Sequence, residues 1–382
     1  MRKILITGGA GFIGSHLARH LLADGMHLRI LDPLAPQIHG ALPQAGELDW
    51  LNEERIEFVR ASVTDRRAVE AALEDVTHIV HLAAETGTGQ SMYEVARYNE
   101  VNSQGTAVLL DVLANRRDLA VKQIVLASSR SVYGEGAYVC PACGDAAGRV
   151  FPGARLAAQL EAHRWEPVCP HCGGTLLAVP TREDDPVRPA SIYAATKYAQ
   201  EDLVRIACES LGMGYAILRF QNVYGEGQSL KNPYTGILSI FSTRIRRGLD
   251  LPIFEDGLES RDFVHVDDVA RAVHACLRAG EPIDRIINVG SGVGTSVMEV
   301  ARQLVLSLGI EVPVRVTAQY RLGDIRHNVA DITRLAELLP GGPRVGLAEG
   351  LDRFAAWVRT QPLPEDGLDR ANAELRARKL MV

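Results

Sequence analysis

Short hydrophobic segments alternate with amphipathic ones from the N-terminus onward. Apolar runs at 3–7, 28–32, 56–60, 78–83 and 123–128 have the length and composition of buried strands. Between them lie segments whose apolar residues recur at intervals of three and four, as on one face of a helix. This alternation predicts an α/β fold built on a Rossmann-type, doubly wound parallel sheet.

The pattern breaks at 136–180, where prolines, glycines and four cysteines cluster, and resumes with a helix at 193–211 and a strand at 215–220. Beyond Asn222 the chain mixes loops with helices, one of which starts at a capping box formed by Ser296 and Glu299. The last twenty residues are charged and helix-prone, and are interpreted as a solvated tail or a docking helix.

Composition narrows the class of protein. The chain has 382 residues, 47% of them hydrophobic, and a formal net charge of −6, enough for one large domain or two lobes. No apolar run approaches the length of a membrane span, and the N-terminus has the pattern of a strand and a glycine turn rather than of a signal peptide. No block of Lys and Arg suggests a nucleic-acid partner. We expect a cytoplasmic protein in which Cys208 and Cys276 are buried apolar residues.

A glycine motif, TGGAGFIG, joins the first strand to the first helix through Gly8, Gly11 and Gly14. Glycines at these positions let the backbone approach a pyrophosphate, whose charge is met by the helix N-terminus. Asp32, eighteen residues after Gly14, ends the second strand; its carboxylate would accept hydrogen bonds from an adenine-ribose diol and repel a 2′-phosphate. The motif therefore predicts NAD rather than NADP, the alternative being a glycine turn without a cofactor.

Tyr193 and Lys197 stand four residues apart on a predicted helix and share one of its faces. A tyrosine pKa of about 10 makes a poor base at neutral pH, and a nearby ammonium together with a cationic nicotinamide would lower that pKa. With the hydroxyl of Ser129, the three side chains would move a proton while the cofactor takes a hydride.

Seven motifs, TGGAGFIG, HLAA, SSRSVYG, YAATK, LRFQNVYG, RDFVHVDDVA and RLGDIRH, occur in the order found in the extended short-chain dehydrogenase/reductase family. The chain resembles the nucleotide-sugar epimerases and dehydratases of this family over nearly its whole length, apart from the cysteine-rich segment. The resemblance implies catalysis by Ser129, Tyr193 and Lys197, and a homodimer packed through the helices around 92–114 and 193–211. It further implies that a nucleotide diphosphate sugar is held by Thr86, Ser129, Arg130, Asn222, Arg261, Arg321 and Asp324, where guanidinium groups suit phosphate oxygens.

The same resemblance assigns further cofactor contacts. They are Gly8, Gly11, Phe12, Ile13, Gly14, Asp32, Ser62, Val63, Leu82, Ala83, Ala84, Asn102, Ser128, Tyr193 and Lys197. Ser62 stands where the family usually has an aspartate for the adenine. The resemblance also implies a division into a Rossmann domain at 1–135, an insertion at 136–180, the rest of the Rossmann domain with its catalytic helix at 181–221, and a smaller α/β substrate lobe at 222–382, from which some segments return to the core.

The type of reaction follows from what the motifs lack. Dehydratases of this family carry an Asp-Glu pair directly after the Ser or Thr, where this chain has Arg130 and Ser131, and the glutamate of the decarboxylating members is also absent. This leaves oxidation and re-reduction at one carbon, which is 4-epimerization. The segments AAETGTGQSMYE and SSRSVYGEG, the second closely followed by cysteines, most resemble those of the dTDP-L-rhamnose 4-epimerases. This resemblance implies the interconversion of dTDP-L-rhamnose and dTDP-6-deoxy-L-talose. The alternatives are a UDP-sugar 4-epimerase (UDP-glucose/galactose or UDP-glucuronate), a dehydratase or reductase, and, in another class, a non-catalytic NAD-sensing scaffold.

Cys140, Cys143, Cys169 and Cys172 form two C-P-x-C-G knuckles separated by 25 residues. Two matched knuckles predict a structural zinc ribbon with four thiolate ligands, although the gap exceeds the usual range of about 15–20. Redox dithiols are the rival interpretation, and a catalytic zinc is disfavoured because four thiolates leave no open position. Because the ribbon lies between Ser129 and Tyr193, we expect it to order a flap near the substrate site.

Overall fold

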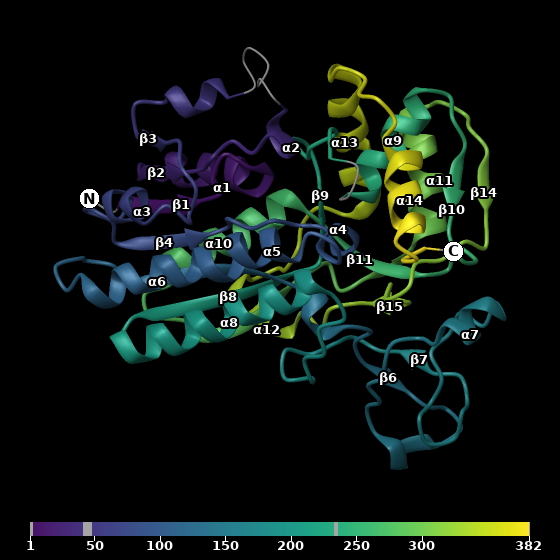
Figure 1. The fold of residues 1–382 in the computed structure, drawn as a ribbon. Coiled ribbons are helices and arrows are strands. Elements are labelled where there is room, and N and C mark those ends of the chain that lie inside the picture. The colour runs from purple at the N-terminus through teal and green to yellow at the C-terminus, as the bar shows by residue number, and fades with distance from the viewer. Residues whose placement is uncertain (1–2, 41–47, 233–235, 382) are drawn as a thin grey trace.

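The computed structural model describes residues 3–40, 48–232 and 236–381 of the chain. Its centre is a seven-stranded sheet whose neighbouring strands all run parallel (Figure 1). The strands lie side by side in the order β12 (Arg285–Val289), β8 (Gly214–Phe220), β5 (Gln123–Ser129), β4 (His78–His81), β1 (Lys3–Thr7), β2 (His27–Leu31) and β3 (Ile56–Val59). The predicted α/β class and parallel sheet are confirmed.

Helices cover both faces of this sheet because alternate strand residues point to opposite sides. Ile4 and Ile6 face a core completed by α1 (Phe12–Ala23), α10 (Val266–Arg278) and α12 (Thr333–Leu338). Leu5, between them, faces a second core completed by α3 (Arg66–Ala72), α6 (Gly105–Asn115) and α8 (Ile192–Leu211). The result is a doubly wound sheet.

The order of the strands reverses at β1, which lies between β2 and β4. The chain moves outward from β1 to β3, then returns to β4 and continues in the other direction. Such a switch point opens a crevice at the carboxyl ends of the strands, where α/β proteins bind ligands. Gly8 follows β1 and Leu82 follows β4 directly, so both lie at this crevice.

The C-terminal lobe occupies the right of Figure 1 and packs around a core of its own. Its helices are α9 (Ile237–Arg246), α11 (Val297–Leu308) and α13 (Leu347–Thr360). Its strands are β9 (Asn222–Tyr224), β10 (Leu251–Ile253), β11 (Ser260–His265), β13 (Gly294–Ser296), β14 (Val314–Val316) and β15 (His327–Asn328). Parallel pairing of β9 with β11 brings Asn222 beside Phe263, so the lobe begins directly beyond the end of β8.

The segment 136–180 forms a small unit below this lobe, at the lower right of Figure 1. It contains the antiparallel strands β6 (Tyr138–Val139) and β7 (Leu177–Ala178), the helix α7 (Ala157–Glu161) and a core of Tyr138, Val150 and Leu176 with two of the cysteines. Just beyond it, the Thr181 amide donates to the Val329 carbonyl at 2.8 Å, and the Asp331 amide donates to the Thr181 carbonyl at 2.8 Å. The base of the unit is therefore attached next to β15.

Several smaller predictions can also be compared with the structure. The Ser296 hydroxyl accepts from the Glu299 amide at 3.1 Å, as the capping box requires, and Cys208 and Cys276 are fully buried. The C-terminal residues form α14 (Leu368–Ala377), which buries Leu368, Ala371 and Leu375, so the docking helix is the correct interpretation of the tail. Among the described residues, no helix combines the length and the apolar composition needed to cross a bilayer.

The remaining elements are short. They are α2 (Pro36–His39), α4 (Thr88–Ser91), α5 (Val95–Tyr98), 3₁₀ turns at Asp49–Asn52, Arg130–Tyr133 and Gly144–Ala147, and a π-helical stretch at Asn99–Gln104 that joins α5 to α6.

Candidate active site

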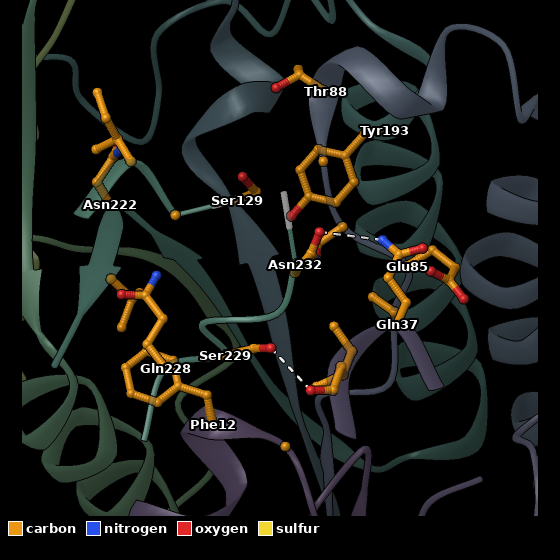
Figure 2. Close-up of a pocket in the computed structure, with 18 of the residues that line it drawn as sticks. Phe12, Gln37, Glu85, Thr88, Ser129, Tyr193, Asn222, Gln228, Ser229 and Asn232 are labelled. Atoms are coloured by element: carbon orange, nitrogen blue, oxygen red, sulfur yellow. Dashed lines mark hydrogen bonds between the residues drawn. The ribbon is translucent and has the colours of Figure 1, made fainter. Parts of the chain in front are cut away.

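A cavity of about 640 Å³ opens at the switch point and extends into the C-terminal lobe (Figure 2). It brings together most of the residues singled out from the sequence. They are Gly8, Gly11, Phe12, Ile13, Gly14, Asp32, Ser62, Val63, Leu82, Ala83, Ala84, Thr86, Ser129, Arg130, Tyr193, Asn222, Arg261, Arg321 and Asp324.

The glycine motif forms a tight turn at the N-terminus of α1. Gly8 has φ +68°, and a Cβ there would lie 2.7 Å from the Ala83 amide nitrogen at the end of β4. A Cβ on Gly14 would lie 2.3 Å from the Gly9 carbonyl oxygen, so only glycine lets the first turn of α1 pack on β1. The first amides of a helix have no partner within it, and here they face the cavity beside Gly11. The turn fits an anionic pyrophosphate.

The carboxylate of Asp32 is held at the end of β2. It accepts from the Ala10 amide at 3.1 Å and the Leu34 amide at 2.8 Å. Burial raises the pKa of Asp32, although these amides oppose the shift. Ser62 also lines the cavity, where its hydroxyl pairs with that of Thr64 at 2.8 Å. Asp32 is thus placed to accept from a ribose diol in the same cavity as the glycine turn.

Tyr193 lies in the first turn of α8 and faces Ser129 across the cavity (Figure 2). Ser191 caps the helix by accepting from the Ala194 amide at 3.1 Å. The Tyr193 amide donates to the Ser91 hydroxyl at 3.0 Å, which fixes this turn against α4. The Ser129 hydroxyl lies where β5 ends and accepts from the hydroxyl of Ser131 at 3.0 Å.

The charge around Tyr193 differs from the prediction. Burial raises the pKa of Tyr193, and the groups that lower it are the Ser129 hydroxyl and the Arg130 guanidinium. Lys197, predicted to lower the pKa of Tyr193, is not among them in this structure. Its ammonium donates to Gln200 at 2.7 Å, and burial lowers the pKa of Lys197 to about 7. The sequence does not predict that Arg130 lies near the Tyr193 phenol, because the position of the Arg130 guanidinium depends on how the chain turns after β5.

Arg130 connects the phenol to the C-terminal lobe. Its Nε donates to the Asn222 side-chain oxygen at 2.8 Å, directly beyond β8. Burial, and then the charge of Arg261, lower the pKa of Arg130 to about 10. A guanidinium therefore stands where dehydratases of this family have a carboxylate.

The far end of the cavity is rich in guanidinium groups. Arg261 donates to the Asp324 carboxylate at 3.4 Å and to the Ile325 carbonyl at 2.8 Å. Arg321 lies over the Phe254 ring at 4.9 Å, and its buried Nε has no hydrogen-bond partner among the described residues. Burial would raise the pKa of Asp324, but the surrounding guanidinium groups, Arg261 first, lower it. An unsatisfied buried donor on Arg321 near a second guanidinium fits a diphosphate.

Three predicted site residues do not line the cavity. Asn102 is fully buried and braces the segment after β4, accepting from the Glu85 amide at 2.7 Å. The Ser128 hydroxyl turns away from the cavity and donates to Glu201. Lys197 lies behind Tyr193, held by Gln200. All three support the wall of the site from inside the fold.

Other lining residues carried no sequence signal. Figure 2 shows Gln37, Glu85, Thr88, Gln228, Ser229 and Asn232 around the cavity. Glu255 and Glu259 line its far end, where burial raises the pKa of Glu259 to about 7. Gln37 and Thr88 lie on the short helices α2 and α4 and the others lie on loops, and nothing in the local pattern separates them from other polar residues.

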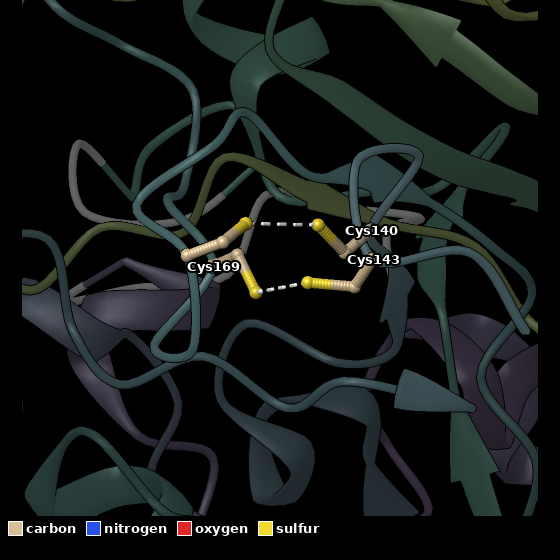
Figure 3. Close-up of side chains that lie close together, drawn as sticks. Cys140, Cys143 and Cys169 are labelled. Carbon is tan, nitrogen blue, oxygen red and sulfur yellow. Dashed lines mark hydrogen bonds between the residues drawn. The ribbon is translucent and has the colours of Figure 1, made fainter. Parts of the chain in front are cut away.

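The four cysteines of the insertion converge at one point (Figure 3). Their sulfur atoms all lie within 4.8 Å of one another, with 3.5 Å between Cys140 and Cys172 and 3.9 Å between Cys143 and Cys169. Tetrahedral Zn–S bonds of about 2.3 Å place sulfur atoms about 3.8 Å apart. These separations fit such a site and are too long for disulfide bonds.

The two knuckles have equivalent backbones. Gly144 has φ +60° and donates to the Cys140 carbonyl at 3.1 Å; Gly173 has φ +72° and donates to the Cys169 carbonyl at 2.8 Å. Burial raises the pKa of Cys169, but the backbone amides of Cys172 and His171 lower it to about 6. The glycine that ends each C-P-x-C-G knuckle thus turns the chain around a sulfur atom, and the donor set suits a thiolate-bound metal.

Comparisons with known proteins agree with this geometry. A dTDP-L-rhamnose 4-epimerase from Burkholderia thailandensis is 41% identical over 97% of each chain. The crystal structure of a UDP-glucose 4-epimerase from Thermus thermophilus, in complex with NAD, matches with 27% identity and a TM-score of 0.70, covering 94% of this chain and 100% of the other. A UDP-N-acetylglucosamine 4-epimerase from Methanobrevibacter ruminantium, in complex with UDP-N-acetylmuramic acid, matches with 26% identity and a TM-score of 0.75, covering 94% and 99%.

The family profile described as "NAD dependent epimerase/dehydratase family" matches residues 4–150 and 172–290. These ranges include the glycine motif, Ser129, Tyr193 and Arg261. The interval between them falls within the insertion. The chain belongs to the NAD-dependent epimerase/dehydratase family.

Proposed function

We propose that this protein is an NAD-dependent nucleotide-sugar 4-epimerase that interconverts dTDP-L-rhamnose and dTDP-6-deoxy-L-talose. The observation that carries the reaction type is Tyr193 facing Ser129, next to a turn that holds Arg130 and Ser131 in place of an acid-base pair. The 41% identity to the Burkholderia enzyme over 97% of both chains supports the choice of substrate. A UDP-sugar 4-epimerase is the second candidate, supported by the likeness to the Thermus and Methanobrevibacter structures.

In the proposed reaction, Tyr193 removes the proton of the sugar 4-hydroxyl as C4 loses a hydride, and returns the proton to the same oxygen when a hydride is added to the opposite face of C4. The glycine turn and Asp32 would hold NAD, which would accept the hydride as NAD⁺ and return it as NADH. Ser129 hydrogen-bonds the reacting oxygen, and Arg130 stabilises the phenolate by its charge. The 4-keto sugar turns over within the cavity between the two transfers.

Binding of the substrate is assigned to the C-terminal side of the cavity. Arg261 and Arg321 would hold the diphosphate, with Asp324 fixing their orientation, and Asn222 and Thr86 would contact the sugar. Fixed guanidinium groups suit phosphate oxygens because they donate in a planar fork. The sugar is thereby held at the Tyr193 end.

The reaction type is tested by incubating the protein with dTDP-L-rhamnose in deuterated water. An epimerase returns the hydride that it removes, so we expect no build-up of NADH and no deuterium at C5 of the product. NMR of the sugar nucleotide gives the product and its isotope content, and absorbance follows NADH. Stoichiometric NADH would identify a dehydrogenase instead. In a parallel incubation with dTDP-glucose, which has the 6-hydroxyl that dTDP-L-rhamnose lacks, deuterium at C5 would identify a dehydratase.

The same NMR assay with UDP-glucose, UDP-galactose and UDP-glucuronate separates the two candidate substrates. Turnover of a UDP sugar but not of dTDP-L-rhamnose would select the second candidate. A protein that binds NAD and epimerizes none of them would support the scaffold alternative.

We further propose that the four clustered cysteines bind one structural zinc ion that orders the insertion. The purified protein is expected to contain about one zinc per chain, and Cys140→Ser with Cys169→Ser to remove it, because each knuckle loses a ligand. Hydrogen exchange should then increase across residues 136–180 while NAD content stays unchanged. Cys208→Ala, at a buried cysteine outside the cluster, is the matched control and should keep its zinc. Elemental analysis without zinc under reducing conditions would contradict the proposal.

We propose that the protein forms a homodimer through α5, α6 and α8. Tyr198, Leu203 and Ile206 on α8, together with Met92 and Val95 beside α5, keep their apolar side chains exposed. Exposed apolar side chains on neighbouring helices are typical of subunit contacts.

A further inference from the structure

We infer that Arg155, carried by the cysteine-containing insertion, is a positioning residue that holds together two walls of the nucleotide end of the substrate cavity. The inference rests on the proposed function, since it assigns the far end of the cavity to the diphosphate of a sugar nucleotide.

Arg155 lies in the insertion, and its side chain packs into the C-terminal lobe. Its side chain is only 2% exposed. The guanidinium donates to both carboxylate oxygens of Glu255, at 2.8 and 2.7 Å, and to the Asp324 carbonyl at 3.0 Å. A planar fork with this many partners has a single geometry, which lysine cannot reproduce.

The two partners of Arg155 belong to different walls. Glu255 follows β10 and Phe254, and Asp324 follows Arg321; all of them line the cavity. The backbone also joins these walls, because the Glu255 amide donates to the Gln319 carbonyl at 2.8 Å. Arg155 therefore fixes the segment that carries Arg321 against the segment that carries Phe254.

Neighbouring residues of the insertion strengthen the same contact. The Trp165 ring lies 6.1 Å from that of Tyr320, which lines the cavity. Glu166 accepts from Arg326 at 2.8 Å, and Arg326 donates in turn to Glu255 at 3.0 Å. The part of the insertion between the two cysteine knuckles thus contacts the loop at 320–327 through a ring contact, hydrogen bonds and an ion pair.

Arg155 is not placed to touch the substrate. Its terminal nitrogens are engaged by Glu255, Asp324 and the Trp165 carbonyl, and its Nε lies 3.5 Å from the Glu135 carboxylate. The family profile does not match residues 151–171, which include Arg155. The contacts that Arg155 makes with the C-terminal lobe are therefore an addition to the fold shared by the family. Their effect should fall on the placement of Arg321 and Asp324, and so on affinity for the diphosphate.

The test compares Arg155→Lys and Arg155→Met with Arg149→Lys. Arg149 is another arginine of the insertion, ion-paired to Asp185 and remote from both walls. We expect Arg155→Lys to raise KM for the sugar nucleotide about tenfold, Arg155→Met to raise it further, and kcat to stay within about twofold. Arg149→Lys should change neither.

Calorimetry with dTDP alone distinguishes positioning from a general loss of structure. The Kd of dTDP should rise by the same factor as KM, with NAD content and melting temperature near those of the wild type for Arg155→Lys. Should Arg155→Met fail to fold because Glu255 then keeps Arg326 but loses its two-pronged partner, Arg155→Met with Glu255→Met removes both charges and should still bind dTDP weakly.

Two results overturn the inference in distinguishable ways. Wild-type protein that binds dTDP, with Arg155→Lys binding equally well, would refute the role of Arg155 and leave the proposed function intact. Wild-type protein that binds neither dTDP nor UDP would remove the proposed function and the inference together.

Discussion

Replacing Tyr193 with phenylalanine is expected to lower kcat by about 10²–10⁴-fold while leaving affinity for the sugar nucleotide nearly unchanged. The phenylalanine ring keeps the edge-on contact with Tyr98, whose ring centre lies 6.4 Å away, so the cavity keeps its shape. Only the hydroxyl that faces Ser129 is lost, and with it the group that accepts the proton of the substrate. Steady-state kinetics and calorimetry with the same sugar nucleotide measure the two quantities.

Tyr198→Phe provides the matched control. Tyr198 lies on the same helix but is partly exposed, and it does not line the cavity. Its loss of a hydroxyl should leave kcat and KM unchanged. A Tyr193→Phe variant whose kcat falls by less than about tenfold would show that another group removes the proton.

The second large effect is expected from Arg219→Met, which should lower the free energy of unfolding by about 3–5 kcal/mol. Arg219 on β8 donates to both carboxylate oxygens of Glu201 on α8, at 2.9 and 2.7 Å, and both side chains are buried. Ser128, next to Ser129, donates to the same carboxylate. Removing the Arg219 guanidinium leaves the buried Glu201 carboxylate, on the helix that carries Tyr193, without the guanidinium that it binds.

Urea unfolding measures this effect, and Arg205→Met supplies the comparison. Arg205 lies on α8, as Glu201 does, but its ion pairs with Asp202 and Glu209 are exposed. Its loss should therefore change the free energy of unfolding by less than about 1 kcal/mol. Equal losses for the two variants would contradict the importance assigned to the buried pair. Arg219→Met with Glu201→Leu should recover part of the stability because no unpaired charge remains.

The sequence predicts the central sheet well because its strands are local, apolar and regularly spaced. The runs ending at Thr7, His81 and Ser129 form neighbouring strands whose ends meet at the cavity. The family resemblance implies that some segments beyond 222 return to this core, but the hydrophobic pattern does not identify them as β12 and α12. Hydrophobic pattern marks a segment as buried, but the identity of the partner depends on tertiary packing.

The candidate site divides in the same way. Motifs with fixed spacing place Gly8, Ser129 and Tyr193 in one cavity, as expected. The charge around Tyr193 could not be predicted, because burial lowers the pKa of Lys197 and a turn brings Arg130 close. The contacts of Arg155 with Glu255 join positions 100 residues apart, and no local pattern identifies such a pair.

The contacts between the insertion and the C-terminal lobe have a consequence for protein engineering. A deletion of residues 136–180 would not restore a simpler member of the family, because Glu255 would be left buried without Arg155, and Arg326 without Glu166. To transfer the insertion into another enzyme of the family, residues 255–256 and 320–327 would therefore have to be transferred with it. Libraries that recombine homologous enzymes should place their crossovers so that these three stretches are inherited from one parent.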